Sequence, residues 1–198
     1  DEVVRSAIES EILRGGQVYF LHNRVADIGK VEKRLREILG DGRVAVESCS
    51  CRKDGQNSSL PLQLKTTTKP PRIVVAHGQM DSRTLAKKMR DFERGEYDIL
   101  LSTTIVESGI DIPRANTILV DQADRFGMAD LYQLRGRVGR SSRQGYAYFL
   151  LPPSGAIDAE ARERLAALKR HGGLGAGFNL AVRDLELRGA GNLLGSQQ

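Results

Sequence analysis

The chain has 198 residues, of which 40% are hydrophobic and 28% are charged; this is the composition of an ordinary globular protein with one domain, or one domain and an appendage. It contains no apolar run long enough to cross a membrane, and its first residues lack the basic-then-apolar order of a signal peptide. Thirty Lys and Arg against twenty-five Asp and Glu leave a net charge of +5, which permits nucleic-acid binding without demonstrating it.

Short apolar runs alternate with amphipathic helical patterns along the chain. An opening helix is expected to stop at Gly15 and Gly16. The apolar runs predict five strands, at residues 17–23, 72–77, 98–104, 116–120 and 146–151. This alternation indicates an α/β fold, a doubly wound parallel sheet whose ligands collect at the carboxyl ends of the strands.

Two of the expected helices lie between these strands. The first follows the first strand and has one apolar face, made by Ile28, Val31, Leu35 and Ile38. The second precedes the third strand, and we expect Ser82 to cap its first turn.

Residues 47–71 interrupt the alternation. The segment is polar, contains three prolines and has no periodicity, so we expect a mobile insertion between the helix that follows the first strand and the second strand. The sequence RVAV just before it is suited to a short additional strand. Cys49 and Cys51 lie within the segment, and a metal site would require about four ligands, so reduced thiols of a cytoplasmic protein are expected.

The composition changes again after the fifth strand. A helical pattern with Ala161, Leu165 and Leu168 in one stripe precedes a glycine-rich turn at 172–177 and a second helical pattern. We therefore expect two parts: a lobe over 1–151, and a helical hairpin over 152–198 that ends in the loop GAGNLLGSQQ.

The segment TTIVESGIDIP (103–113) carries a first set of candidate site residues. Thr103 and Thr104 end a predicted strand, where hydroxyl groups can bond phosphate oxygens. Gly109 allows close backbone approach, and Asp111 can accept a hydrogen bond from a sugar hydroxyl. The alternative is an ordinary turn in which Thr caps, Gly turns and Asp ends the connection.

The segment QLRGRVGR (133–140) carries a second set, Arg135, Arg137 and Arg140. No Asp or Glu occurs from residue 131 through 157, and the two glycines let the chain turn. Guanidinium groups match phosphate well, although a solvated basic helix end is the alternative. The chain lacks the sequence GxxxxGK[ST], so it has no P-loop of its own. HGQM suits either a phosphate contact through His77 and Gly78 or a structural turn.

Taken together and in order, these segments resemble the motifs of a known family. QVYFLHN, RIVVAHGQM, STTIVESGIDIPRANT and QLRGRVGRS resemble the successive motifs of the second RecA-like lobe of superfamily 2 helicases. DLELRGAGNLLGSQQ resembles the translocation motif of the RecG-like group, which contains the branched-DNA helicase RecG and the bacterial transcription-repair coupling factors. The phrases AHGQM, LGAGF and RGAG are more similar to the coupling factors than to RecG.

The resemblance implies an ATP-driven double-stranded DNA translocase that displaces stalled RNA polymerase and recruits excision-repair proteins through other domains. ATP and Mg²⁺ would be held mainly by a first RecA-like lobe that this chain does not contain, so the chain alone should be inactive. The implied roles fall into three groups: Arg137 and Arg140 reach the γ-phosphate, with Gly109, Asp111 and Gln133 beside the nucleotide; His77, Gly78, Thr103 and Thr104 contact DNA; Arg135, Arg188 and Gln198 couple ATP state to translocation.

Two alternatives remain beside the coupling-factor interpretation. One is the corresponding lobe of RecG, and the other is a non-catalytic DNA-binding module that kept the fold. The arginine pair disfavours the module, because passive DNA binding does not require two guanidinium groups directed at a lobe interface.

Overall fold

A single parallel sheet organises the chain. The computed structural model describes residues 1–40, 70–103, 112–139, 143–152 and 157–170. The sheet has the order β2-β3-β1-β4-β5, and all four pairings are parallel. Its strands are β1 (Gln17–Leu21), β2 (Ile73–Ala76), β3 (Ile99–Ser102), β4 (Ala115–Val120) and β5 (Tyr146–Phe149). The five predicted strands are confirmed, although four of them end one or two residues earlier than expected.

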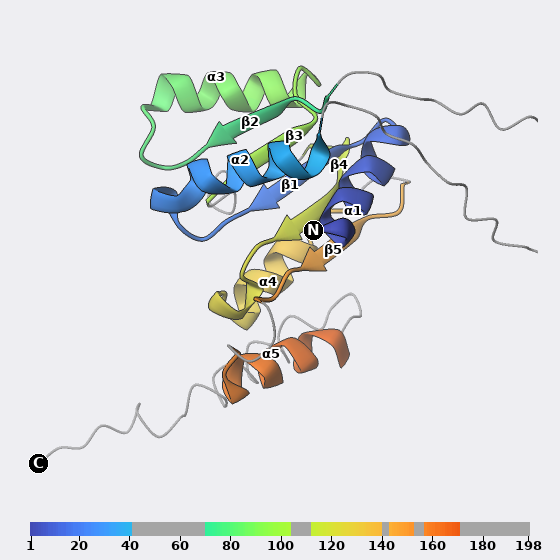
Figure 1. Cartoon of the computed structure of the whole chain (residues 1–198), viewed down its shortest axis with the longest axis vertical. Coiled ribbons are helices and arrows are strands. Elements are labelled where there is room, and N and C mark those ends of the chain that lie inside the picture. The colour runs from blue at the N-terminus through green and yellow to red at the C-terminus, as the bar shows by residue number, and fades with distance from the viewer. Residues whose placement is uncertain (41–69, 104–111, 140–142, 153–156, 171–198) are drawn as a thin grey trace, which may run out of the picture.

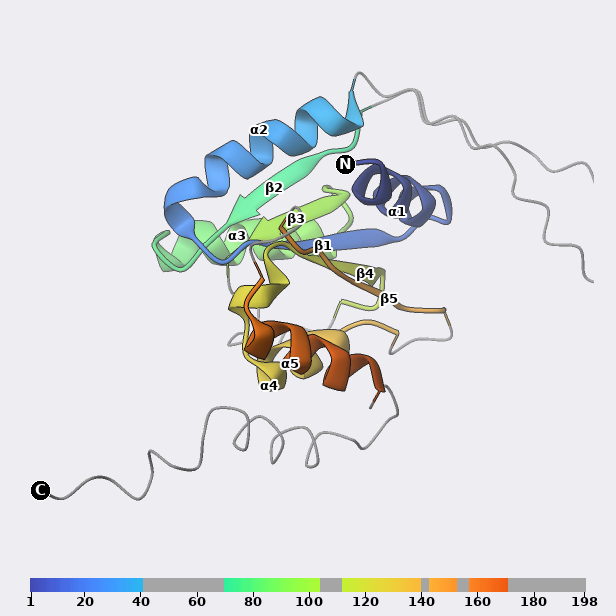
Figure 2. The ribbon, with the colours of Figure 1, turned by 60° about the horizontal axis from the view of Figure 1, so that its bottom comes forward.

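Five helices cover the two faces of this sheet (Figure 1). They are α1 (Glu2–Leu13), α2 (Ile28–Leu39), α3 (Ser82–Glu93), α4 (Met128–Arg135) and α5 (Ala159–Arg170). Helices α1 and α2 pack on one face, while α3 and α4 pack on the other, with α5 alongside α4 (Figure 2). The predicted α/β fold with a doubly wound parallel sheet is therefore confirmed.

The alternation of side chains along β1 explains why both faces are covered. Val18 and Phe20 point into the cluster under α1 and α2, whereas Tyr19 and Leu21 point into the cluster under α3 and α4. All five residues of this central strand are buried. A strand buried on both sides reads as a continuous apolar run, which is why these runs were visible in the sequence.

The cap of α3 differs from the prediction. Asp81, not Ser82, is the N-cap: its backbone is extended and its Oδ1 accepts a hydrogen bond from the Thr84 backbone N–H at 2.9 Å. Ser82 is the first helical residue instead. The prediction of Ser82 was wrong because Asp and Ser are both good caps, and the sequence alone does not say at which of the two the backbone turns.

Several predictions lie outside the described residues. They concern the bulk of the expected insertion with Cys49 and Cys51, the short strand RVAV, and the second half of the hairpin. The first helical pattern of the expected hairpin forms α5, and Ala161 and Leu168 of the predicted stripe are buried, with Leu165 packed beside them. No helix in the described part of the chain is long and apolar enough to cross a membrane.

Candidate functional site at the carboxyl edge of the sheet

Four residues follow four adjacent strands at the carboxyl edge of the sheet. His77 follows β2, Thr103 follows the end of β3, His22 follows β1, and Asp121 follows β4. The register aligns the strand ends, with Ala76 beside Ser102 and Leu21 beside both Ser102 and Val120. Parallel pairing therefore gathers side chains that are as many as 99 positions apart in the sequence.

The pairing of β1 with β4 is the switch point of the sheet. The chain leaves β1 toward α2 on one face and leaves β4 toward α4 on the other. Connections that diverge in this way open a crevice between the two strand ends, where ligands of doubly wound sheets bind.

His22 and Asp121 face each other across this switch point. Their side chains are joined by a 2.8 Å contact between His22 Nδ1 and Asp121 Oδ2. The His22 ring is 98% buried, since only 2% of it is exposed, and its Nε2 has no hydrogen-bond partner within the described residues. The next residue, Gln122, has a left-handed backbone (φ 52°, ψ 52°), and its buried Oε1 likewise has no partner there.

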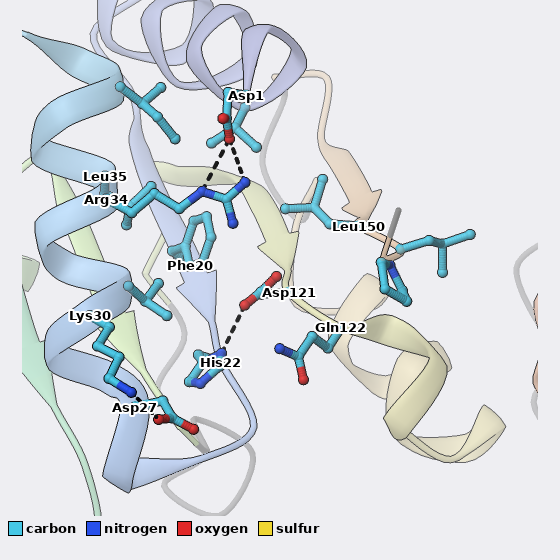
Figure 3. A pocket seen from close by; sticks show the side chains of 15 residues that line it. Asp1, Phe20, His22, Asp27, Lys30, Arg34, Leu35, Asp121, Gln122 and Leu150 are labelled. Carbon is cyan, nitrogen blue, oxygen red and sulfur yellow. Dashed lines mark hydrogen bonds and ion pairs between the residues drawn. The ribbon is translucent and has the colours of Figure 1, made fainter. Parts of the chain in front are cut away.

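A pocket of about 550 Å³ opens beside this pair (Figure 3). It lies between α2, the start of α1 and the end of β5. Phe20, Leu35 and Leu150 provide apolar walls, while the charged side chains at its rim are paired: Arg34 Nη2 lies 2.5 Å from Asp1 Oδ1, and Lys30 Nζ lies 3.4 Å from Asp27 Oδ1. The pocket thus combines an apolar lining with a few polar atoms at the strand ends.

The predicted DNA-contacting residues in the described part of the chain lie at this same edge. Thr103 is buried, with 6% exposed, His77 is half-buried and Gly78 is exposed. The Nδ1 atom of His77 is buried and has no partner among the described residues. Thr104, the fourth predicted contact, lies outside them.

The start of α3 completes the edge on the side of β2. Hydrogen bonds from Thr84, through its side chain and then its backbone, lower the pKa of the Asp81 carboxyl. Asp81 therefore caps α3 with a carboxylate, and this helix start is less suited to phosphate than its position alone suggested.

The described residues predicted to reach the nucleotide or to couple translocation lie around the end of α4 instead of at a strand end. Gln133 is exposed on α4, and Arg135 and Arg137 are half-buried at and just beyond its last turn. The Arg137 backbone N–H donates to the Leu134 carbonyl at 3.0 Å, so the helical path continues to Arg137. Gly109, Asp111, Arg140, Arg188 and Gln198 lie outside the described residues.

Only one of the two glycines in this motif has a left-handed backbone conformation. Gly139 has a φ of +76°, whereas Gly136 has ordinary helical angles. A Cβ atom on Gly145 would lie 2.4 Å from the Gly139 nitrogen, so the chain on either side of residues 140–142 meets backbone against backbone. Gly136 lies in the turn that ends α4, but only Gly139 has a backbone that favours glycine.

The side chains around the end of α4 are of a type suited to anion binding. The end of α4 offers guanidinium groups, which can bond phosphate with two parallel donors. Within the described ranges, no group of three or more His, Cys, Asp or Glu residues is placed to hold a metal ion.

His22, Asp121 and Gln122 were not predicted as site residues. The available signal was their position: His22 and Asp121 each end or directly follow a predicted strand, where the fold collects its ligands. Their separation along the chain hid the pair, because no local pattern indicates that β1 and β4 are neighbours.

Comparison with known proteins agrees with this geometry. Residues 30–142 match the model of the helicase conserved C-terminal domain. The chain belongs to this family. It is 45% identical over 98% of its length to the transcription-repair-coupling factors of Staphylococcus epidermidis and Staphylococcus aureus, and it spans 14% of the length of these relatives. The resemblance to the RecG-like helicases is thereby confirmed.

Solved structures give the same result for the fold. The structure of RecG bound to a three-way DNA junction matches with a TM-score of 0.67 and 29% identity over 96% of this chain and 21% of that chain. Saccharomyces cerevisiae Dbp5 bound to RNA and ADP BeF3 matches with a TM-score of 0.51 and 16% identity over 91% of this chain and 40% of that chain. At that identity the second match supports the RecA-like fold alone.

Proposed function

We propose that the chain is the C-terminal motor lobe of an ATP-dependent double-stranded DNA translocase that displaces stalled RNA polymerase in transcription-coupled DNA repair. The observation that carries this proposal is the 45% identity to transcription-repair-coupling factors, which extends over 98% of the chain rather than over the helicase domain alone. RNA polymerase and excision-repair proteins would be engaged through other domains of the longer, cytoplasmic protein.

The active site would be shared between two lobes. Arg137 and Arg140 would reach the γ-phosphate of ATP, while Gly109, Asp111 and Gln133 would lie beside the nucleotide. The P-loop and the Mg²⁺ ligands would come from the first RecA-like lobe. Among these residues, the structure describes Gln133 and Arg137, which lie near and just beyond the end of α4. Residues that act across a lobe interface need to lie close together in this way. The chain alone would then hydrolyse no ATP.

DNA would run along the carboxyl edge of the sheet. Buried Thr103 and half-buried His77 end adjacent strands there, with exposed Gly78 beside them, and Thr104 is proposed to continue the row. Hydroxyl, imidazole and backbone N–H groups suit phosphate and sugar contacts, which hold a duplex without reading its sequence. Arg135, Arg188 and Gln198 would couple the ATP state of the motor to movement along the duplex.

A second candidate is the corresponding lobe of RecG, favoured by the TM-score of 0.67 to the structure of RecG on a DNA junction. The two candidates differ in what the motor moves. A coupling factor acts on a stalled polymerase, whereas RecG acts on branched DNA.

The test compares the two activities in the full-length protein. We expect ATP-dependent displacement of RNA polymerase stalled on a linear template, with little reversal of a model replication fork. Arg188→Ala should retain much of the ATPase activity and abolish displacement, and Arg125→Ala, an exposed neighbour of α4, serves as the control. Fork reversal without polymerase displacement would favour the RecG-like candidate. Absence of ATPase activity even with DNA would contradict both candidate functions.

A further inference from the structure

One exposed face of α3 carries a row of positive charges, here called the α3 stripe. It consists of three helical residues and the C-cap residue: Arg83, Lys87, Arg90 and Arg94. Their intervals of four, three and four residues place them on one face of the helix, and all four are exposed. Met89 and Phe92 are buried on the opposite face, so the stripe points away from the sheet.

The charge of the α3 stripe is not compensated within the described part of the chain. No carboxylate or carbonyl there forms an ion pair or hydrogen bond with any of its four side chains. The acids of the helix, Asp91 and Glu93, lie to either side of the stripe by the helical period. Lys88 is directed inward instead, where its Nζ donates to the Val75 carbonyl at 2.8 Å.

Helix α2 also carries four cations, but each of them is paired. The pairs are Lys30 with Asp27, Lys33 with Glu37, Arg34 with Asp1, and Arg36 with Glu32. Opposite charges three or four residues apart stabilise a helix, whereas like charges at these spacings destabilise it. The helix dipole favours cations in the last turn of α3 but not Arg83 in its first turn. Helix stability therefore does not explain the α3 stripe.

The α3 stripe begins beside the proposed DNA contacts. His77 and Gly78 follow β2, which is an outer strand of the sheet, and α3 starts shortly after them. Figure 1 shows α3 alongside β2, on the side of the sheet away from β5 and α5. From Arg83 the stripe runs along the helix to Arg94 for about 16 Å, which is the length of about five base pairs.

The composition of this face fits phosphate better than a protein surface or unpaired bases. The large hydrophobic residues that are exposed in the described ranges are Val3, Tyr146 and Leu151, all outside α3. Protein interfaces have an apolar centre, and single strands stack their bases on aromatic side chains. A row of cations with neither feature matches the regularly spaced phosphates of a duplex.

We propose that the α3 stripe is a second DNA-binding surface, which holds the phosphate backbone of the duplex where it leaves the carboxyl edge past β2. The inference rests on the proposed function and adds a contact outside the row of strand ends. A duplex that follows the edge meets Arg83 first and curves along α3 to reach Arg94. The contact is independent of sequence, because phosphates carry no base information.

The test measures binding of the full-length protein to random-sequence duplex DNA by fluorescence anisotropy over a range of salt concentrations. The stripe variant is Lys87→Gln with Arg90→Gln. Its matched control, Lys33→Gln with Arg36→Gln, removes two exposed cations from α2 and changes the net charge equally. A third variant, Lys87→Arg with Arg90→Lys, keeps the charge of the stripe.

The salt dependence of binding reports the number of phosphates that the protein neutralises. Each one contributes about 0.9 to the slope of log affinity against log salt. We expect the stripe variant to lose about 1.8 of this slope and to bind about tenfold or more weakly at ~0.1 M salt. The control and the charge-keeping variant should retain the wild-type slope. A slope equal to that of the control would overturn the proposal, and this is the result expected if the stripe binds an acidic protein surface instead.

A hydroxyl-radical footprint locates the contact on the duplex. Because α3 flanks an outer strand of the sheet, the footprint of the stripe variant should be shorter at one end only. No shortening, or equal shortening at both ends, would overturn the proposal. Wild-type protein that binds no duplex DNA would overturn the proposed function as well, whereas wild-type binding with an unchanged slope and footprint in the stripe variant would overturn this inference alone.

Discussion

At the scale of single residues, a buried carboxylate joins the first helix to the centre of the sheet. Glu11 is 1% exposed, and its Oε2 accepts hydrogen bonds from Thr117 Oγ1 at 2.5 Å and from Arg14 Nε at 2.9 Å. Gly16 passes so close that a Cβ atom there would lie 1.6 Å from Glu11 Oε1. Because Gly16 has no side chain, it leaves room for the carboxylate of Glu11.

Gly16→Ala should destabilise the chain for this reason. The added methyl group would displace a buried charged group from its partners, and we expect a loss of about 1–3 kcal/mol in the free energy of unfolding. Urea unfolding of the chain measures it. Gly29→Ala is the matched control, because a Cβ atom on Gly29 of α2 meets nothing within 4 Å; it should be neutral or slightly stabilising. Equal stability of the two variants would contradict this account of Gly16.

Residue-scale details were only partly predictable from the sequence. Thr103, His77 and Gly78 were predicted correctly to end strands, because an apolar run followed by polar residues marks the edge of a sheet. The partner of His22 was not predicted, since Asp121 is 99 positions away. The role of Gly16 was taken to be a helix stop, and nothing local reveals that a glutamate side chain fills the space beside it.

At the scale of elements, the strands and helices were predictable and their arrangement was not. Buried strands are recognisable in the sequence as apolar runs, and the buried face of α2 is recognisable from apolar residues at helical spacing. Four of the predicted strands ended one or two residues too late, because hydrophobicity does not mark where pairing stops. The order β2-β3-β1-β4-β5, which creates the switch point between β1 and β4, depends on contacts between distant segments.

The docking of α5 on α4 is an element-scale interaction that can be tested on its own. Leu168 is 4% exposed and belongs to the cluster beneath α4. Leu168→Ala should cost about 2–5 kcal/mol, the usual range for a buried leucine, and should speed hydrogen exchange in α5 before the sheet is affected. Lys169→Ala, at an exposed position of the same helix, should change stability by less than about 0.5 kcal/mol. A similar small effect for both would mean that α5 is not held by this face.

At the scale of the whole molecule, the lobe separates two sets of groups. The carboxyl edge of the sheet gathers His22, His77, Thr103 and Asp121, while the guanidinium groups lie beyond the end of α4. In the proposed motor, one of these surfaces would hold DNA while the other responds to the nucleotide.

The central claim is that this lobe completes an ATP site held by another lobe. The most direct test measures the DNA-stimulated ATPase rate of the full-length protein with both Arg137 and Arg140 changed to Ala. We predict a fall in turnover of about 10³-fold or more, as for other arginines that act across an interface, with DNA binding largely retained and Arg125→Ala at the wild-type rate. Turnover that survives the double change would contradict the claim.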